Sequence, residues 1–186
     1  MIALLDACVL YTATLRNLLM WTASNRLYQA RWTDAIHDEW IGNLLEHQPE
    51  LDPVKLQRTR RLMDAIHEEC LVTGYEHRIS TLTLPDSDDR HVLAAAIESR
   101  ATVIVTFNLS DFPRKILAPM GIQALHPDKF LANLFQDNSS KFLDTARTHR
   151  TSLKKPPQSV PEYLETLKVC GLRDLAVLLA SYPDQI

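Results

Sequence analysis

The chain has 186 residues, of which 46% are hydrophobic and 23% charged, and its formal net charge is −3. This composition is that of an ordinary globular protein, and the length suits one domain of common size with a shorter appendage. The negative charge argues against a protein that coats nucleic acid through a uniformly basic surface. Local basic clusters do occur at Arg58-Arg60-Arg61, Arg114-Lys115 and Lys154-Lys155, although each is also explained as a solvated helix face.

Membrane and disulfide-based classes are not indicated. No apolar run approaches the roughly 20 residues that span a bilayer, and the first residues lack the basic flank of a signal peptide. We therefore expect a cytoplasmic protein. The three cysteines, Cys8, Cys70 and Cys170, form no CxxC pair, so we expect small buried side chains rather than a disulfide framework or a zinc site.

The first elements alternate between strand and helix. Ile2 to Leu5 is a short apolar run that ends at Asp6, which is typical of a buried parallel strand. A helix is predicted from Leu15 to Trp21, followed by a second short strand over residues 28–32. Thr33 or Asp34 then caps a helix whose apolar stripe has Glu39 at its edge.

The middle of the chain repeats this alternation. Asp52-Pro53 predicts the start of a helix whose buried side includes Leu62, Met63 and Ile66, and Leu71-Val72 is a weak strand candidate. The acidic segment 86–89 starts a small, apolar helix. The β-branched run 103–106 predicts a central parallel strand. The fold class is therefore α/β, a parallel-sheet sandwich with right-handed crossovers.

After about residue 135 the pattern becomes helical only, which predicts an α/β domain over 1–135 and a helical C-terminal extension over 136–186. The predicted features of the extension are a helix introduced by Asn138 and Ser139, a stiff linker at Lys154-Lys155-Pro156-Pro157, a capping box from Ser159 to Glu162, a helix end at Gly171 and a last helix over 172–179.

Four acids stand where chemistry is expected. Asp6 and Asp111 follow predicted strands, Asp89 lies in the first turn of a helix, and Glu39 lies at a helix edge. Because the carboxyl ends of parallel strands meet at one edge of a sheet, we expect these side chains to converge. Clustered carboxylates need a cation, and oxygen ligands favour Mg²⁺ or Mn²⁺. Phosphodiester hydrolysis fits such a site.

Taken singly, each acid also has a structural explanation. An Asp after a strand is often a turn residue, and Glu39 alone would be a solvated helix residue. Asp86 and Asp88 are expected to cap the helix start, which leaves Asp89 without that role. The prediction of a metal site therefore depends on the ordered set.

Four segments carry a resemblance to a known family. They are Leu5-Asp6-Ala7-Cys8-Val9-Leu10, Trp32-Thr33-Asp34-Ala35-Ile36-His37-Asp38-Glu39-Trp40, Pro85-Asp86-Ser87-Asp88-Asp89-Arg90-His91-Val92-Leu93-Ala94-Ala95-Ala96 and Val105-Thr106-Phe107-Asn108-Leu109-Ser110-Asp111-Phe112. In this order and spacing they resemble the PIN-domain family, especially its VapC-like toxins, over roughly the first 135 residues. The resemblance implies a Mg²⁺-dependent endoribonuclease in which Asp6, Glu39 and Asp89 match the first three acids and Asp111 the fourth. It also implies an RNA substrate, a small antitoxin partner and a homodimer.

The sequence departs from this family at two positions, and other interpretations stay open. Asn108 stands where many relatives have an acid, which puts a second metal in doubt, and Cys8 replaces a small hydroxyl residue. The first alternative is therefore a non-catalytic PIN-fold module that binds RNA or regulates. A receiver-like signalling domain would also place acids at one edge of a parallel sheet, but no convincing phosphoacceptor Asp or later Lys is found. Hydrolases with an Asp-x-Asp nucleophile are disfavoured by Cys8.

Four further side chains have two interpretations each. His37 and His91 flank predicted site acids and could contact RNA or metal, although solvated or hydrogen-bonded histidines are the commoner case. Arg16 and Arg90 could hold phosphate or form surface salt bridges.

Overall fold

A four-stranded parallel sheet with the strand order β2-β1-β3-β4 forms the centre of the computed structural model, which describes residues 1–154 and 156–186. Its strands are β1 (Ile2–Leu5), β2 (Gln29–Arg31), β3 (Val103–Val105) and β4 (Gln123–Leu125). Ala3 pairs with Ala30 on one side of β1 and with Val103 on the other. This parallel arrangement confirms the α/β class. The edge strand β4 was not predicted, because its three residues lack the apolar pattern of a buried strand.

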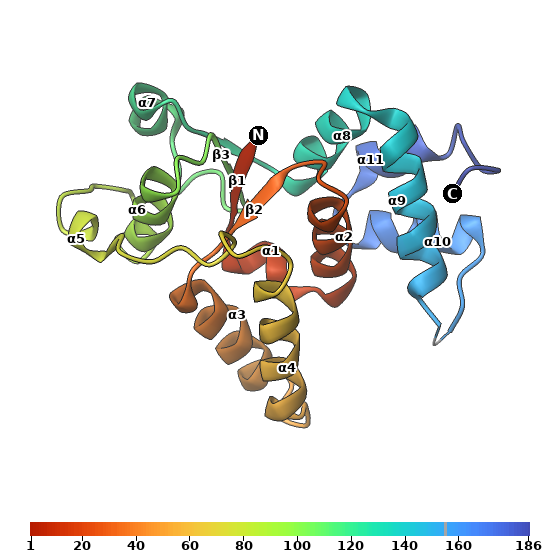
Figure 1. Cartoon of the computed structure of the whole chain (residues 1–186), viewed down its shortest axis with the longest axis horizontal. Helices are drawn as coiled ribbons and strands as arrows, with labels where there is room; N and C mark the ends of the chain where they lie inside the picture. The colour runs from red at the N-terminus through yellow and green to blue at the C-terminus, as the bar shows by residue number, and fades with distance from the viewer. Residues whose placement is uncertain (155) are drawn as a thin grey trace. The chain divides into compact units, whose positions relative to one another are not determined.

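The described chain divides into two compact units (Figure 1). Met1–Tyr11 and Gln29–His126 form the first, here the sheet unit, and Thr12–Tyr28 and Pro127–Ile186 form the second, here the helical unit. Within the described residues, no helix combines the length and the apolar character that crossing a bilayer requires.

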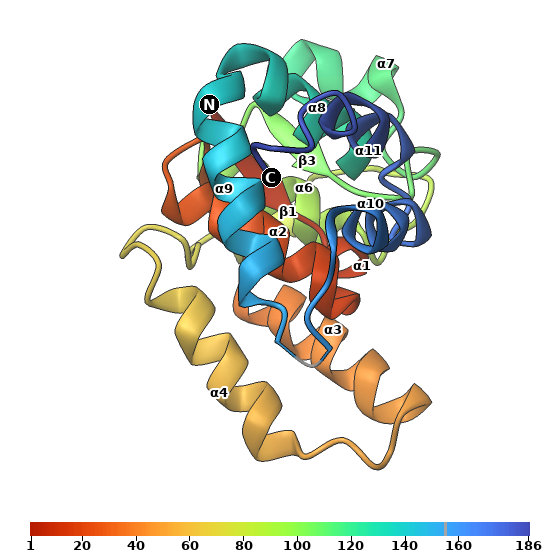
Figure 2. The ribbon, with the colours of Figure 1, turned by 90° about the vertical axis from the view of Figure 1, so that its right-hand side faces the viewer.

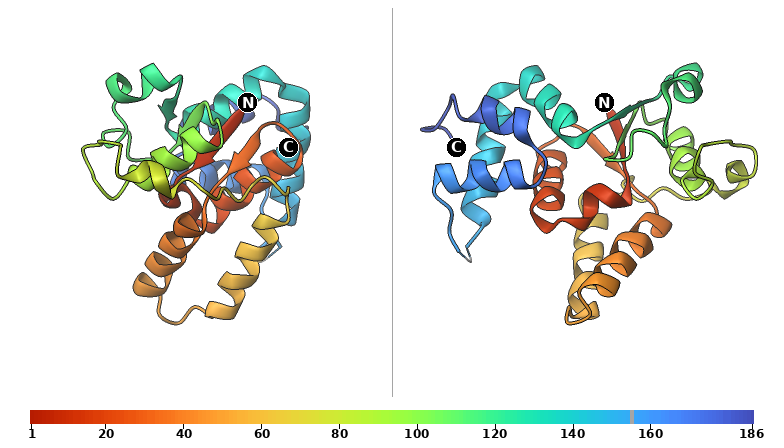
Figure 3. Two further views of the ribbon diagram at one scale, coloured as in Figure 1. Left: turned by 60° about the vertical axis from the view of Figure 1, so that its left-hand side comes forward. Right: turned by 180° about the vertical axis from the view of Figure 1, so that it is seen from behind.

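Helices of the sheet unit follow β1, β2 and β3 along the chain. They are α1 (Ala7–Tyr11), α3 (Asp34–His47), α4 (Pro53–Asp64), α5 (Glu76–Ile79), α6 (Arg90–Glu98), α7 (Arg114–Leu117) and the 3-10 helix η1 (Ala118–Met120). Helix α6 packs on β1 and β3 (Figure 3), and its buried residues Val92 to Ala96 are mostly small, which permits this close approach.

Helices α3 and α4 form a hairpin (Figures 1 and 2). Thr33 caps α3 by accepting the Ile36 N–H, and Asp52 caps α4 ahead of Pro53, as predicted. The predicted buried side of α4 is only partly correct. Met63 is buried, but Leu62 is 62% exposed, because α4 contacts the rest of the unit on one side only.

Two other predictions beside α4 also need correction. Ile66 is half-buried and lies beyond the end of α4, which stops at Asp64. Leu71 forms an isolated parallel bridge with Trp32 instead of a full strand with Val72. The short apolar pair is therefore a single point of contact with the sheet, because two residues are too few to extend the ladder.

The helical unit is built from α2 (Ala13–Ser24), α8 (Pro127–Asp137), α9 (Ser139–Ser152), α10 (Val160–Val169) and α11 (Arg173–Leu179). Helix α9 packs against α2 and α8, and α11 packs against α8 and α10 (Figure 2). Asp128 on α8 accepts the backbone N–H groups of Asp174 and Leu175, so it caps α11 from a distance in sequence.

Several predicted features of this unit are confirmed. Asn138 caps α9, Ser159 and Glu162 form the capping box of α10, and Gly171 ends that helix with φ +82°. Of the predicted linker, Lys154 and Pro157 form an antiparallel bridge, while Lys155 lies outside the described residues. The division of the chain at residue 135 stays a prediction.

Candidate active site

Asp6 stands immediately after β1 and is only 3% exposed. Its N–H donates to the Val105 carbonyl at 3.1 Å, which continues the sheet ladder and fixes the backbone. Its carboxylate accepts the Ala7 N–H at 2.7 Å and the Thr106 hydroxyl at 2.7 Å. Burial raises the pKa of Asp6, hydrogen bonds to the carboxylate oppose this effect, and the nearby charge of Glu39 adds to it. Keeping a charged carboxylate at this edge of the sheet therefore lowers the stability of the folded state.

Thr106 is one of two residues at the site that were not predicted from the sequence. It is fully buried after β3, and its hydroxyl donates to Asp6 Oδ2 and accepts the Asn108 N–H at 2.9 Å. One side chain therefore joins the ends of two neighbouring strands and shapes the loop that leads to Asp111. The position of a hydroxyl residue directly after a predicted central strand was the available signal.

Cys8 also contacts the site, instead of packing as a small buried residue. Its thiol donates to Asp6 Oδ2 at 3.1 Å and accepts the Phe107 N–H at 3.3 Å. Burial, followed by the charge of Asp6, raises the pKa of Cys8 to about 12, so the thiol stays protonated at neutral pH. Only Cys70 is buried as predicted, because Cys8 and Cys170 are half-buried.

Asp89 occupies the N-cap position of α6 rather than its first turn. Among the described residues its side chain takes no capping hydrogen bond, while Asp86 accepts the Asp88 N–H within the preceding turn. Asp86 therefore stabilises a turn and not the helix start that was predicted for it. Asp88 accepts the Ser87 hydroxyl at 3.4 Å. The Asp89 carboxylate is left for another role.

The pKa of Asp89 shows how the acids are arranged. Burial raises it to about 6, and the charges of Asp6, Asp111, Asp86 and Glu39 add to the rise in that order. The three other predicted site acids are thus all close enough to Asp89 to repel its charge. Asp89 lies electrostatically at the centre of the set.

Glu39 reaches the site from α3. Its carboxylate lies 3.7 Å from the His91 Nε2, and its side chain is 45% exposed. His91 belongs to α6, directly after Asp89 and Arg90, so this contact brings the second and third sequence motifs together. The Nδ1 of His91 is buried, and no hydrogen-bond partner for it exists among the described residues.

Asp111 lies at the end of the loop after β3. Its N–H donates to the Asn108 carbonyl at 3.1 Å, and its carboxylate accepts the Ser110 hydroxyl at 3.2 Å. Asn108 is exposed, and its side chain is not part of the network around Asp6 in the described structure. The loop therefore presents an acid and an amide from one short turn.

The donor set fits a hard cation in chemistry. Its members are carboxylates that repel one another, and a divalent cation would remove that repulsion. Across residues 1–154 and 156–186, however, no three Asp, Glu, His or Cys side chains lie close enough together to hold a metal ion. The carboxylates thus share one region of the sheet edge without forming a closed cage.

The two histidines and two arginines have distinct surroundings. His37 is fully buried, accepts the Trp40 indole N–H at Nδ1 and lies 3.0 Å from Asp64 at Nε2, so it is a hydrogen-bonded core residue. Arg90 donates to the Ser87 carbonyl at 2.8 Å. Arg16 is buried in the helical unit, where burial lowers its pKa to about 10, so it is not a surface residue.

Comparison with known families gives this geometry a context. The family model described as "PIN domain" matches residues 3–110, which is more than half of the chain. The chain belongs to the PIN-domain family. Asp6, Glu39 and Asp89 lie inside the matched residues of this PIN domain, and Asp111 follows directly after them. The resemblance inferred from the four sequence motifs is confirmed.

The C-terminal helices match a second family model, described as "VapC50 C-terminal domain", over residues 127–181. A protein of Mycobacterium tuberculosis (strain ATCC 25618 / H37Rv) named "Putative ribonuclease VapC50" is 65% identical over 43 residues. That stretch covers 23% of this chain and 25% of the relative, so the chain spans about a quarter of the relative's length in this match. No solved structure matches the chain.

Proposed function

We propose that this PIN-domain protein is a metal-dependent endoribonuclease and the toxin of a toxin–antitoxin pair, acting in the cytoplasm. The observation that carries the proposal is the repulsion that Asp6, Asp111 and Glu39, together with Asp86, exert on the half-buried carboxylate of Asp89. A purely structural set of turn and cap residues has no reason to accumulate uncompensated charge at one place. The named relative adds support, because its name describes a ribonuclease.

We assign Asp6, Glu39, Asp89 and Asp111 as the residues that would hold the ion, with Mg²⁺ as the cofactor and Mn²⁺ as the alternative. A bound divalent cation lowers the pKa of a coordinated water and polarises a phosphoryl oxygen. The chain's own contribution is positional. Thr106 and the Ala7 N–H fix the orientation of the Asp6 carboxylate, and His91 lies beside that of Glu39. Asp89, on which the charges of the other three acids act, is the residue that we assign to orient the attacking water.

The partners that we propose are the RNA substrate, a small antitoxin protein and a second copy of the chain in a homodimer. They follow from the family to which the chain belongs and from the relative's name. A non-catalytic PIN-fold module that binds RNA or regulates is the second candidate, and the exposed Asn108 in place of an acid is the observation in its favour.

RNA cleavage with Mg²⁺ and with EDTA tests the proposal. Wild-type protein should cleave only with the metal, and Asp6→Asn, Glu39→Gln and Asp89→Asn should each abolish cleavage because each removes a charge that holds the ion. Melting temperatures equal to or above that of the wild type would show that these variants keep the fold.

Matched controls are exposed acids of α3 and of the turn that precedes α6. Glu46→Gln on α3 and Asp88→Asn before α6 remove the same charges from exposed positions that are not assigned to the site, so both should cleave like wild type. Cleavage that survives in EDTA overturns the metal-dependent mechanism. RNA binding with no turnover under any metal supports the non-catalytic module instead.

A further inference from the structure

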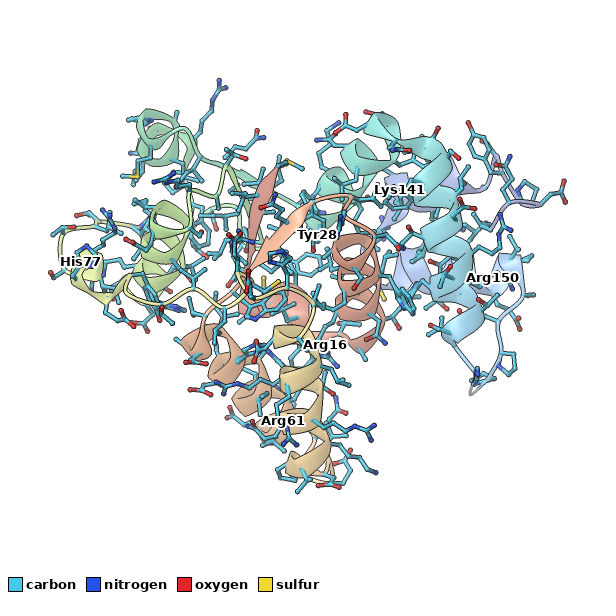
Figure 4. The ribbon with its side chains drawn as sticks, viewed as in Figure 1. Arg16, Tyr28, Arg61, His77, Lys141 and Arg150 are labelled. Atoms are coloured by element: carbon cyan, nitrogen blue, oxygen red, sulfur yellow. The ribbon has the colours of Figure 1, made fainter. Side chains whose placement is uncertain are left out.

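Helix α4 carries three of its four cations in one exposed row. Within Pro53–Asp64 the side chains of Lys55, Arg58 and Arg61 are exposed, whereas Leu56 and Met63 are buried on the opposite side. The three cations follow one another at intervals of three residues, which places them in one row along a helix. At 1.5 Å per residue the row extends about 9 Å along the helix axis. Figure 4 labels Arg61 on this helix.

The charges of this row are not neutralised within the described protein. None of the ion pairs formed by residues 1–154 and 156–186 includes Lys55, Arg58 or Arg61. Like charges three or four residues apart on a helix cost about 0.2–0.5 kcal/mol per pair. Repulsion within the row therefore destabilises the helix slightly, and a bound polyanion would remove this repulsion.

Arg60, on the same helix, shows the contrast. Its guanidinium bonds Asp34 and, at 2.8 Å, Asp38, both on α3, so it holds the two helices of the hairpin together. Of the four cations of α4, one is used to build the fold and three are left facing solvent. Salt bridges between α3 and α4 therefore do not explain why Lys55, Arg58 and Arg61 are present.

The row also begins near the proposed active site. Asp64 at the end of α4 bonds His37 of α3, and Arg60 bonds Asp34 and Asp38, so this end of α4 lies against the turns of α3 that carry Glu39. Arg61 is at the near end of the row and Lys55 at the far end. A strand of RNA cleaved at the acids would have a basic track leading away from them.

We infer that the outward row of Lys55, Arg58 and Arg61 binds the phosphate backbone of the RNA substrate beyond the scissile bond. This inference rests on the proposed ribonuclease function. Charge complementarity selects the occupant, because a chain of net charge −3 and an acidic site need a local positive surface to hold RNA. Val54 and Leu62, which are 70% and 62% exposed beside the row, would instead suit a protein partner, and the experiment separates the two.

The test measures RNA binding in EDTA, where metal-dependent cleavage is prevented, over a range of salt concentrations. Combined Lys55→Gln, Arg58→Gln and Arg61→Gln should weaken the binding of a long single-stranded RNA by about tenfold or more at low salt. The slope of log affinity against log salt concentration is negative. Each lost phosphate contact should make it less negative by about 0.7, so the loss of three contacts should make it less negative by about 2. The difference in affinity between a long and a short RNA should also be smaller for this variant than for the wild type.

A matched control removes three exposed cations from the helical unit. Lys129→Gln, Lys141→Gln and Arg173→Gln change the net charge by the same amount and should keep wild-type affinity and slope. Equal losses in the two triple variants would show a nonspecific charge effect and overturn the inference. Arg60→Gln should differ from both, with a lower melting temperature because the hairpin loses its two bonds to α3.

Two further outcomes separate a failure of the inference about α4 from a failure of the proposed ribonuclease function. If the α4 triple variant keeps wild-type RNA affinity but loses binding to a protein partner, the row is a protein-binding surface and the inference is wrong. If wild-type protein binds RNA through the row but cleaves none with Mg²⁺, the ribonuclease function fails while the binding face is supported.

Discussion

Asp89→Asn should stabilise the metal-free protein at neutral pH, although it should abolish the proposed activity. In the folded chain burial and the charges of Asp6, Asp111, Asp86 and Glu39 raise the pKa of Asp89 from 3.8 to about 6. A raised acid pKa means that the folded state binds more protons than the unfolded state between these two values. The free energy of unfolding therefore falls as pH rises through this interval, and the loss is complete above about pH 6.

The size of this effect follows from the pKa. One pKa unit corresponds to about 1.4 kcal/mol, so a rise from 3.8 to about 6 amounts to at most about 3 kcal/mol. Asp89 is half-buried, and solvent screening reduces the value, so we expect a gain of about 1–2 kcal/mol for Asp89→Asn at about pH 7.5. Near pH 4 the gain should fall below about 0.5 kcal/mol, because the wild-type carboxyl is then protonated in the folded state.

Urea unfolding in EDTA, followed by tryptophan fluorescence, measures these differences. Trp32 and Trp40 are fully buried in the sheet unit that holds the site, so their emission reports its unfolding. Addition of Mg²⁺ should stabilise the wild type and have little effect on Asp89→Asn. A variant that is less stable than wild type at about pH 7.5, or a gain equal at both pH values, would refute the electrostatic account of this site.

Three further outcomes are expected. Thr106→Val removes a hydrogen bond that lowers the pKa of Asp6, so that pKa rises and the acidic limb of the pH–rate profile moves to higher pH. Asp111→Asn should reduce cleavage most at low Mg²⁺ with partial rescue at high Mg²⁺, whereas Asn108→Ala should act on RNA binding, as metal titration of the two variants would show. Cys8, with its pKa of about 12, should react slowly with iodoacetamide at neutral pH in folded protein and quickly in urea, as measured by mass spectrometry.

The sequence predicted those parts of the fold that depend on local patterns. β1 and β3 are continuous apolar runs, and Thr33, Asp52, Asn138 and Ser159 are caps with a local hydrogen-bond partner. It did not predict β4, because an exposed edge strand of three residues has no such pattern. Capping at 86–89 was also misassigned, since Asp, Ser, Asp and Asp are equally suited to a cap and only the three-dimensional turn decides among them.

For the site, the order of the motifs along the chain was sufficient to predict the four acids. It was not sufficient to predict the side chains that hydrogen-bond them. Asp6, Glu39, Asp89 and Asp111 are chemically conspicuous, and a parallel sheet brings strand ends to one edge. Cys8, which bonds the Asp6 carboxylate two residues before it, was not assigned to the site because we expected a small buried side chain there. Thr106 was not assigned to it either, because a hydroxyl becomes informative only when a neighbouring strand supplies the carboxylate that it bonds. That pairing spans about a hundred residues of sequence.

The composition of the helical unit leads to a last prediction, for a deletion of residues 138–186. Helix α2 belongs to this unit, packs against α9, and donates from Asn25 to Thr145 at 3.0 Å, while its Leu15, Leu18 and Leu19 are buried. The deletion removes α9 to α11, and each leucine that it uncovers costs about 1.5–3 kcal/mol. The truncated chain should therefore aggregate or melt far below wild type in size-exclusion and thermal measurements, while Val177→Ser, at a position 67% exposed, should melt near wild type. A monomeric truncated protein with the wild-type melting temperature would show instead that α2 is held without the C-terminal helices.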